Sequence, residues 1–123
     1  MHRWLAVLTL GWGVVAQAGP VEQAEAVAAI RDGKLAIDVR SQSEYEAGTV
    51  LNAVRVDDRR LVPQLKQVMT DRNLVMVVFS SSDSRAGSAQ DKLIKAGYNS
   101  IINGGTYDEL HNALYEISDD PAE

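Results

Sequence analysis

The feature that most constrains the fold is an uninterrupted apolar stretch in the middle of the chain, from Leu74 to Phe79. Consecutive apolar residues rich in valine predict a strand that is covered on both faces, as in a parallel sheet with helices on either side. Because helix and strand patterns alternate along the rest of the chain, the sequence predicts an α/β fold. We expect a small parallel sheet of about four to five strands with helices on both faces.

The other elements are predicted from hydrophobic periodicity and from helix start and stop signals. The expected helices cover residues 21–31, 41–48, 61–69, 85–96 and 107–117, and the expected strands cover 35–40, 54–56, 74–79 and 100–102. Ser41 and Glu44 have the spacing of a capping box. Pro63 fits the third helix only within its first turn. The pair Gly104-Gly105 is interpreted as a turn that lets backbone pack near the polar loop after the Leu74–Phe79 stretch.

The N-terminal residues have the pattern of an export signal. Arg3 is followed by an apolar run from Trp4 to Val15 and then by Ala16-Gln17-Ala18, a small-x-small cleavage pattern. The run is shorter than the roughly 20 apolar residues of a membrane-spanning helix. We therefore expect residues 1–18 to be a signal peptide and residues 19–123 to form one domain. That domain is expected to be periplasmic or secreted, with no membrane anchor after cleavage.

Composition and charge exclude several classes of function. The formal net charge is −5, so nucleic acid is not an expected partner. The chain contains no cysteine, which excludes disulfides, thiolate chemistry and thiolate metal sites. Beyond the expected signal peptide only His111 remains, so neither a metal site nor a cofactor is expected. We interpret His111 as a solvent-facing residue rather than a general base, which argues against a Ser-His-Asp hydrolase.

The segment after the apolar stretch is the best candidate for a functional site. A buried strand that runs through a polar loop into a helix leaves the first helical N–H groups free to hold an anion. A basic side chain at that point adds charge-assisted hydrogen bonds. Serine and aspartate are also ordinary turn and N-cap residues, so the residues alone leave a plain structural turn open. The candidate anion-binding residues are Ser81, Ser82, Asp83, Ser84 and Arg85.

This strand–loop–helix segment resembles the active-site loop of the rhodanese family. In that family a cysteine follows the strand, four loop residues come next, and a basic residue opens the helix. Ser80 stands at the cysteine position and Arg85 at the basic position. Further segments resemble family signatures in the same order: Ile37-Asp38-Val39-Arg40 with Glu44-Tyr45, Tyr45 to Ala53, Ala96-Gly97-Tyr98 and Asn103-Gly104-Gly105.

The resemblance spans about residues 24 to 114. A single rhodanese domain with an export signal is similar to the periplasmic rhodaneses of the phage-shock type. Within the Tyr45–Ala53 segment, Thr49 replaces a histidine of the family and Asn52 replaces a glycine. The resemblance implies that Asp38 and Arg40 form a mainly structural pair. From the residues themselves, residues 57–60 are interpreted as a solvated turn, and Tyr107 and Tyr115 as core or boundary residues rather than a binding platform.

The family resemblance implies sulfur transfer through a cysteine persulfide that the loop amides stabilise. Serine does not satisfy this chemistry, because its hydroxyl ionises far above physiological pH and oxygen forms no equivalent of the persulfide. We expect Ser80 to be inactive and the protein to bind a small oxyanion, a sulfane-sulfur compound or a protein partner. Two alternatives stay open. One is a thiosulfate sulfurtransferase whose nucleophilic cysteine is replaced in this chain, and the other is an interaction domain with no ligand in the loop.

Overall fold

A computed structural model describes residues 20–116 of the 123-residue chain. The expected signal peptide, residues 1–18, lies outside the described residues, as does Ile117 at the end of the last expected helix. The strands are β1 (Leu35–Asp38), β2 (Ala53–Arg55), β3 (Met76–Ser80) and β4 (Ile101–Thr106). The helices are α1 (Gln23–Arg31), α2 (Gln42–Ala47), α3 (Leu61–Val68), α4 (Asp83–Lys95) and α5 (Tyr107–Tyr115), with a 3₁₀ turn, η2, at Asp58–Arg60.

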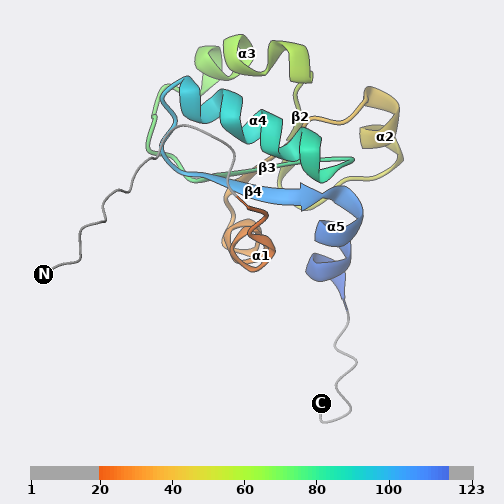
Figure 1. The fold of residues 1–123 in the computed structure, drawn as a ribbon. Helices are drawn as coiled ribbons and strands as arrows, with labels where there is room; N and C mark the ends of the chain where they lie inside the picture. Colours follow the sequence, from red (N-terminus) through yellow and green to blue (C-terminus); the bar gives the residue numbers. More distant parts are fainter. Residues whose placement is uncertain (1–19, 117–123) are drawn as a thin grey trace, which may run out of the picture.

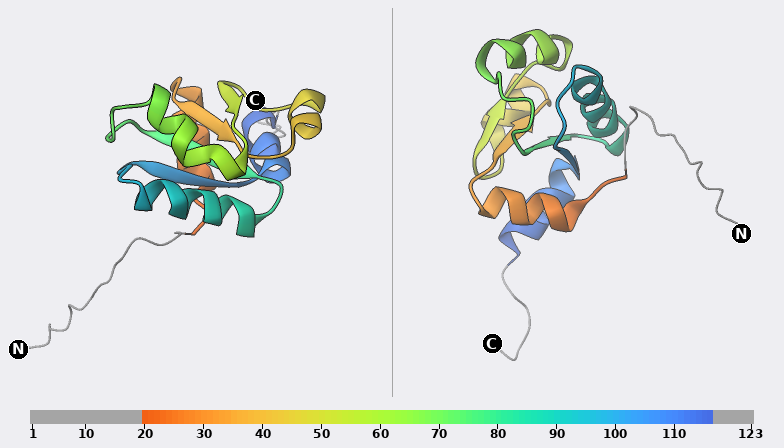
Figure 2. Two further views of the ribbon diagram at one scale, coloured as in Figure 1. Left: turned by 90° about the horizontal axis from the view of Figure 1, so that it is seen from above. Right: turned by 90° about the vertical axis from the view of Figure 1, so that its left-hand side faces the viewer.

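The strands form one parallel sheet in the order β2-β1-β3-β4. Helices α1 and α5 cover one face of the sheet, and α3 and α4 cover the other (Figures 1 and 2). The predicted fold class is therefore confirmed, with four strands. The apolar residues of β3 explain this arrangement, because every residue of β3 is buried and adjacent residues point to opposite faces.

Two hydrophobic clusters hold the helices onto the sheet. One lies under α3 and α4 and includes Ile37, Val78 and Leu93. The other lies under α1 and α5 and includes Val77 and Phe79. Burial of these side chains on both faces fixes β3 in the centre of the sheet, and with it the position of the segment that follows.

The junction of β3 with α4 differs from the expected one. The strand extends to Ser80, which pairs with Thr106 of β4. Helix α4 begins at Asp83, because the hydroxyl of Ser82 accepts a hydrogen bond from the Arg85 amide at 3.1 Å and caps the helix. The expected five-residue loop is thus reduced to Ser81 and Ser82, and Asp83 to Arg85 form the first turn of α4.

The pair Gly104-Gly105 belongs to β4 and is not the predicted turn. Val78 pairs with Asn103 while Phe79 pairs with Gly105, so Gly104 is an extra residue in the ladder, as in a β-bulge. A Cβ atom on Gly104 would lie 2.9 Å from Val77 Cγ1. The close approach at Gly104 is to β3, whereas a Cβ atom on Gly105 would lie 3.4 Å from Asp83 Oδ1 at the start of α4.

The carboxyl ends of all four strands lie along one edge of the sheet. Strand β1 leads into Arg40 and α2, β2 into η2, β3 into α4, and β4 directly into α5. Ligand sites of parallel sheets form at this edge. The expected solvated turn at residues 57–60 contains η2, and Pro63 lies in the first turn of α3, as predicted. Between residues 20 and 116, no helix combines the length and the apolar character needed to cross a bilayer.

Candidate functional site

Ser80 lies at the end of β3, in the middle of the carboxyl edge. Its side chain is fully buried, and its hydroxyl has no hydrogen-bond partner among the described residues. A buried hydroxyl without a partner loses its hydration without compensation, which is uncommon in a folded protein. No base contacts Ser80 Oγ within residues 20–116, so the structure offers no group that would activate it as a nucleophile.

The N-terminus of α4 lies immediately beyond Ser80. The amide of Arg85 is already used by the Ser82 cap, whereas the amides of Asp83 and Ser84 have no acceptor within the described residues. Asp83 places a carboxylate in this first turn and so already complements the helix dipole. The free amides can hold an anion, but the carboxylate of Asp83 opposes a highly charged one.

A buried ion pair supports the edge from the side of β1. Arg40 donates from Nε to Asp38 Oδ1 at 3.0 Å and from Nη2 to Asp38 Oδ2 at 2.8 Å. Thr49 Oγ1 donates to Asp38 Oδ2 at 2.9 Å, and Arg40 Nη2 also donates to the Gly48 carbonyl at 2.7 Å. The expected structural role of Asp38 and Arg40 agrees with these contacts. Thr49, at the position where the family has histidine, completes the same network.

This network keeps the Arg40 side chain in its charged form. Burial disfavours the charged form, but hydrogen bonds and the charge of Asp38 outweigh it and raise the pKa of Arg40 above its ordinary value. The guanidinium carbon lies 3.8 Å from the centroid of the Tyr107 ring, in the range of a cation–π contact. Arg40 is therefore a fixed structural cation, neutralised by Asp38, that positions Tyr107 at the site.

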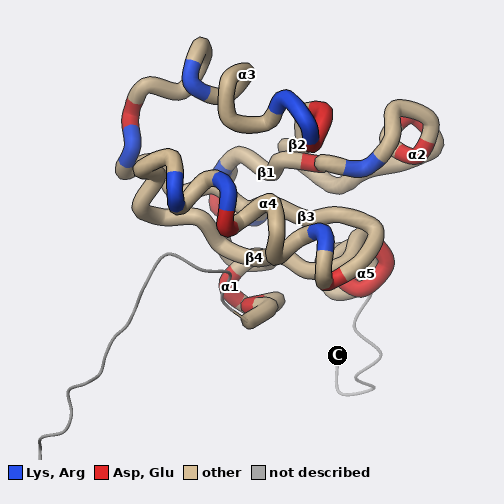
Figure 3. Tube along the Cα trace, turned by 45° about the horizontal axis from the view of Figure 1, so that its top comes forward, with Lys and Arg blue, Asp and Glu red and all other residues tan. Residues whose placement is uncertain are grey.

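Two recesses of opposite character flank the start of α4. We call the first the acidic recess; it measures about 260 Å³ and is lined by Arg40, Glu44, Ser81, Tyr107 and Asp108. We call the second the arginine recess; it measures about 470 Å³ and is lined by Val39, Arg40, Ser41, Arg55, Asp57, Asp58, Arg59 and Arg85. Figure 3 shows acidic residues on α2 and at the start of α5, and a basic residue at the start of α4. The candidate residues Ser81 and Arg85 thus line different recesses.

His111 and the two tyrosines of α5 differ from expectation. The ring of His111 is half-buried between Tyr107 and Tyr115, with centroids 5.3 Å and 4.6 Å away. It is not the fully solvent-facing residue that was expected, because residues four apart stack on one face of a helix. The Tyr115 hydroxyl accepts a hydrogen bond from the Leu51 amide at 2.8 Å. Tyr107 lines the acidic recess, so it is part of the site and not only a boundary residue.

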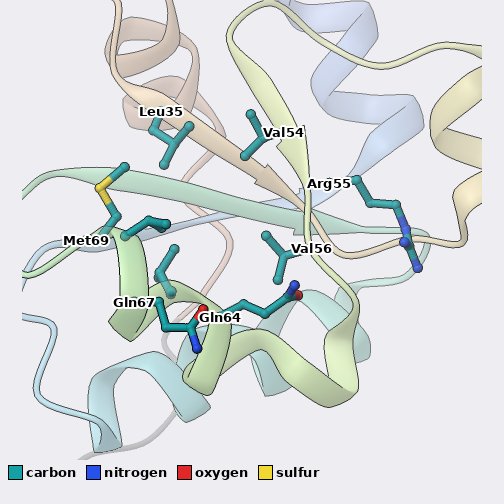
Figure 4. Close-up of a pocket in the computed structure, with 9 residues that line it drawn as sticks. Leu35, Val54, Arg55, Val56, Gln64, Gln67 and Met69 are labelled. Carbon is teal, nitrogen blue, oxygen red and sulfur yellow. The ribbon is translucent and has the colours of Figure 1, made fainter.

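An apolar groove lies away from this edge. A groove of about 340 Å³ runs between β2 and α3, and Val54, Val56 and Met69 are among its lining residues (Figure 4). The side chain of Arg55 begins at this groove and extends away from it (Figure 4). Arg55 Nε donates to the Arg40 carbonyl at 2.8 Å. This hydrogen bond directs Arg55 toward the carboxyl edge, where it lines the arginine recess.

No group of three or more histidine, aspartate or glutamate residues within residues 20–116 is arranged to hold a metal ion. The residues that gather at the edge are serines, arginines and isolated carboxylates. Their hydroxyl and guanidinium groups donate hydrogen bonds to anions, and the carboxylates attract cations. These groups can form charge-assisted hydrogen bonds and ion pairs with a small charged ligand.

The sequence of this α/β domain matches a known family. The sequence profile of the rhodanese-like domain matches residues 22–110. The chain belongs to the rhodanese-like family. Ser80 of this rhodanese-like domain is the last residue of the central strand β3, and the chain contains no cysteine. The resemblance of the sequence to the family motifs aligns Ser80 with the nucleophilic cysteine. No curated protein matches the chain with significance.

Solved structures support the same fold. The rhodanese-like domain of the Alr3790 protein from Anabaena sp. has a TM-score of 0.67 and 18% identity, over 79% of this chain and 76% of that one. A rhodanese with anions from E. coli has a TM-score of 0.59 and 22% identity, over 62% and 89%. The human single-domain sulfurtransferase TSTD1 has a TM-score of 0.61 and 20% identity, over 76% and 96%. At these identities the comparison shows the fold alone.

The sequence analysis did not identify several residues of the candidate site. Glu44, Tyr107 and Asp108 line the acidic recess, and Arg55 lines the arginine recess. Each lies in or after a strand end at the carboxyl edge, and that position was the available signal. The rule that ligands bind at the carboxyl ends of strands was applied only to the segment after β3. Only that segment resembles the nucleophile motif of the family.

Proposed function

We propose that this protein is a rhodanese-like binding module that holds a small oxyanion or sulfane-sulfur compound at the start of α4 and does not transfer sulfur. The observation that carries the proposal is the buried, unpartnered hydroxyl of Ser80 at the nucleophile position. A protein partner that presents such an anion would contact the same residues at the start of α4. The expected absence of a cofactor belongs to this proposal, since anion binding requires none.

Oxygen at this position explains why sulfur transfer is not expected. A cysteine thiolate attacks sulfane sulfur because its pKa lies near neutrality and sulfur is a soft nucleophile. The Ser80 hydroxyl has neither property, and no base contacts it among the described residues. What remains is an edge with free amides at Asp83 and Ser84 and a guanidinium at Arg85. These groups suit an anion that is bound but not consumed.

The proposal is tested by calorimetric titration of the protein with thiosulfate, sulfate and phosphate. Arg85→Gln removes the cation at the start of α4 and is expected to weaken binding several-fold, because a hydrogen bond to a charged group contributes about 1.5–3 kcal/mol at most and less when exposed. Lys95→Gln, at the other end of the same helix, is the matched control and should leave binding unchanged. Absence of binding by all three anions would refute the proposal.

A second candidate function is thiosulfate sulfurtransferase activity in a form of this domain that has the cysteine. Similarity of fold to a human sulfurtransferase favours it. The Ser80→Cys variant tests it through thiocyanate formation from thiosulfate and cyanide, measured beside the unaltered protein. We expect the unaltered protein to stay at background. If the Ser80→Cys variant also stays at background, the surrounding site does not support sulfur transfer and this candidate fails.

We also propose that the protein acts in the periplasm or as a secreted protein. The support is Arg3, the apolar run to Val15 and the Ala16-Gln17-Ala18 cleavage pattern. The absence of cysteine is compatible with an oxidising compartment, because no thiol can be oxidised there. Mass spectrometry of the protein recovered from the periplasm or medium is expected to show a chain that starts at Gly19. A chain recovered from the cytoplasm with Met1 intact would refute the assignment.

A further inference from the structure

The two recesses beside Ser80 carry uncompensated charges of opposite sign. In the arginine recess, Asp57 lies 3.5 Å from Arg59 Nε, and Asp58 lies 3.1 Å from Lys92 Nζ, so these carboxylates already have partners. Arg55 and Arg85 form no ion pair among the described residues. The surplus charge of the arginine recess is therefore positive.

The acidic recess has the opposite balance. Arg40 is neutralised by Asp38 through two side-chain hydrogen bonds, so its charge is not available to a ligand. Glu44 uses Oε1 to accept hydrogen bonds from the amide and hydroxyl of Ser41. It forms no ion pair within 4 Å among residues 20–116, and the charges of Arg40 and Arg85 act on it only from a greater distance. Asp108, at the start of α5, is exposed and also lacks one. The surplus charge of this recess is negative.

The recesses adjoin each other at the start of α4. Arg40 lines both of them, and Ser81 and Arg85, which line one each, are separated by a single helical turn. A simple dianion in this place would meet the guanidinium of Arg85 but also the carboxylates of Asp83, Glu44 and Asp108. A ligand with both signs of charge would satisfy both recesses, because opposite charges attract and like charges repel at this range.

Resting on the proposed anion binding, we propose that the preferred ligand is zwitterionic: a small organic anion, such as an organic thiosulfate, with an ammonium group a few bonds away. The anion contacts Arg85 and the free amides of α4, with Arg55 beside them. The ammonium group lies in the acidic recess between Glu44 and Asp108. Tyr107 forms the wall of that recess and is held in place by Arg40.

Three matched probes test this assignment by calorimetric titration. S-(2-aminoethyl) thiosulfate has both charges, S-ethyl thiosulfate has only the anion, and ethylammonium has only the cation. We expect the zwitterion to bind about threefold to fivefold more tightly than S-ethyl thiosulfate, the gain typical of one partly exposed ion pair. Ethylammonium alone is expected to bind weakest.

Substitutions then locate the ammonium group. Asp108→Asn should reduce the affinity for the zwitterion to that for S-ethyl thiosulfate, and Arg85→Gln should weaken both. Glu109→Gln is the matched control, since Glu109 is the next residue of the same helical turn, is exposed and lines neither recess. The control should leave the ratio of the two affinities unchanged.

The possible results separate this inference from the proposal on which it depends. Equal affinities for the zwitterion and S-ethyl thiosulfate would overturn the inference while anion binding stands. Tighter binding of the zwitterion that survives both Asp108→Asn and Glu44→Gln would overturn the assignment of the acidic recess. No binding of either thiosulfate would refute anion binding itself, and the inference with it.

Discussion

At the scale of single residues, the site depends on the buried contacts that support it. Asp38 is fully buried and accepts hydrogen bonds from Arg40 and Thr49, while Arg40 also bonds to the Gly48 carbonyl. A buried carboxylate and guanidinium persist only as a pair, because either one alone would be an uncompensated charge. The pair therefore fixes the end of α2 at Gly48 and the position of Tyr107 together.

Asp38→Ala tests this role directly. The change leaves Arg40 buried without its partner, and we expect the free energy of unfolding to fall by about 3–5 kcal/mol. Asp32→Ala is the control, since Asp32 forms an exposed ion pair with Lys34 at 3.7 Å and should change stability by about 0.5 kcal/mol at most. Urea denaturation measures both. A loss below about 1 kcal/mol for Asp38→Ala would show that Arg40 finds other compensation.

Glu44 makes one part of the stability dependent on pH. Hydrogen bonds from the Ser41 amide and hydroxyl lower the pKa of Glu44 below its ordinary value of 4.5. The unfolded chain therefore binds this proton more tightly than the folded one. The stabilisation is complete above pH 4.5 and is lost as the pH falls through the lowered pKa of the folded state.

Glu44→Gln removes this titration but keeps a side-chain oxygen for the capping box. We expect the free energy of unfolding of the variant to depend less steeply on pH below 4.5 than that of the unaltered protein. Glu46→Gln, on the same helix, is the control. Denaturation curves at a series of pH values measure the slopes. Identical slopes for Glu44→Gln and the unaltered protein would contradict the assignment of this group.

Asn52 explains one departure from the family pattern at the same scale. Its φ is +64°, a conformation that glycine adopts freely and asparagine tolerates better than most residues. Its side-chain amide donates to the Ile30 carbonyl at 2.9 Å and so ties the turn before β2 to the end of α1. Asparagine therefore replaces the glycine of the family motif without loss of the turn.

At the scale of elements, strand β4 and helix α5 bring the second wall of the site to the edge. The bulge at Gly104 shifts the register of β4 by one residue between Val78 and Phe79. The shift places Thr106 opposite Ser80, and Thr106 then caps α5 through a hydrogen bond from the Glu109 amide at 3.2 Å. The start of α5, with Tyr107 and Asp108, is thereby set beside the start of α4.

Gly104→Ala tests the bulge. The new methyl group would lie 2.9 Å from Val77 Cγ1 and 3.2 Å from Leu110 Cδ2, so β4 or α5 must move. We expect a loss of about 1–3 kcal/mol in the free energy of unfolding, typical of overpacking. Combining it with Val77→Ala relieves the nearer contact, so the double variant should lose less than the sum of the single ones. Additive losses would show that this contact does not set the position of β4.

The sequence predicted these elements well where the hydrophobic periodicity was strong. It predicted poorly the positions at which α4 begins and β4 ends. The apolar run of β3 and the capping box at Ser41 identified a strand and a helix that the structure contains. The start of α4 at Asp83 and the extension of β4 to Thr106 were missed. The bulge depends on pairing with β3, which a single segment of sequence does not show. The cap of α4 is local, but several neighbouring serines could each have been the N-cap residue.

At the scale of the whole molecule, a parallel sheet with helices on both faces places four strand ends on one edge. The sequence predicted this architecture and the central place of Ser80, because the apolar strand and the family motifs occur in order. It did not predict the pairing of recesses with opposite charge. Arg55 and Asp108 are 53 positions apart in the sequence. The order of the strands in the sheet brings both to the same edge, where each lines one of the two recesses.

In the proposed function, the edge around Ser80 holds an anion although the chain has no sulfur nucleophile. The most direct measurement is the amide NMR spectrum of the protein during titration with thiosulfate, sulfate and phosphate. We expect saturable shifts of the Ser81, Asp83 and Ser84 amides with at least one of these anions, and much smaller shifts in the apolar groove between β2 and α3. Unchanged positions of these three amides with all of the anions would contradict the claim.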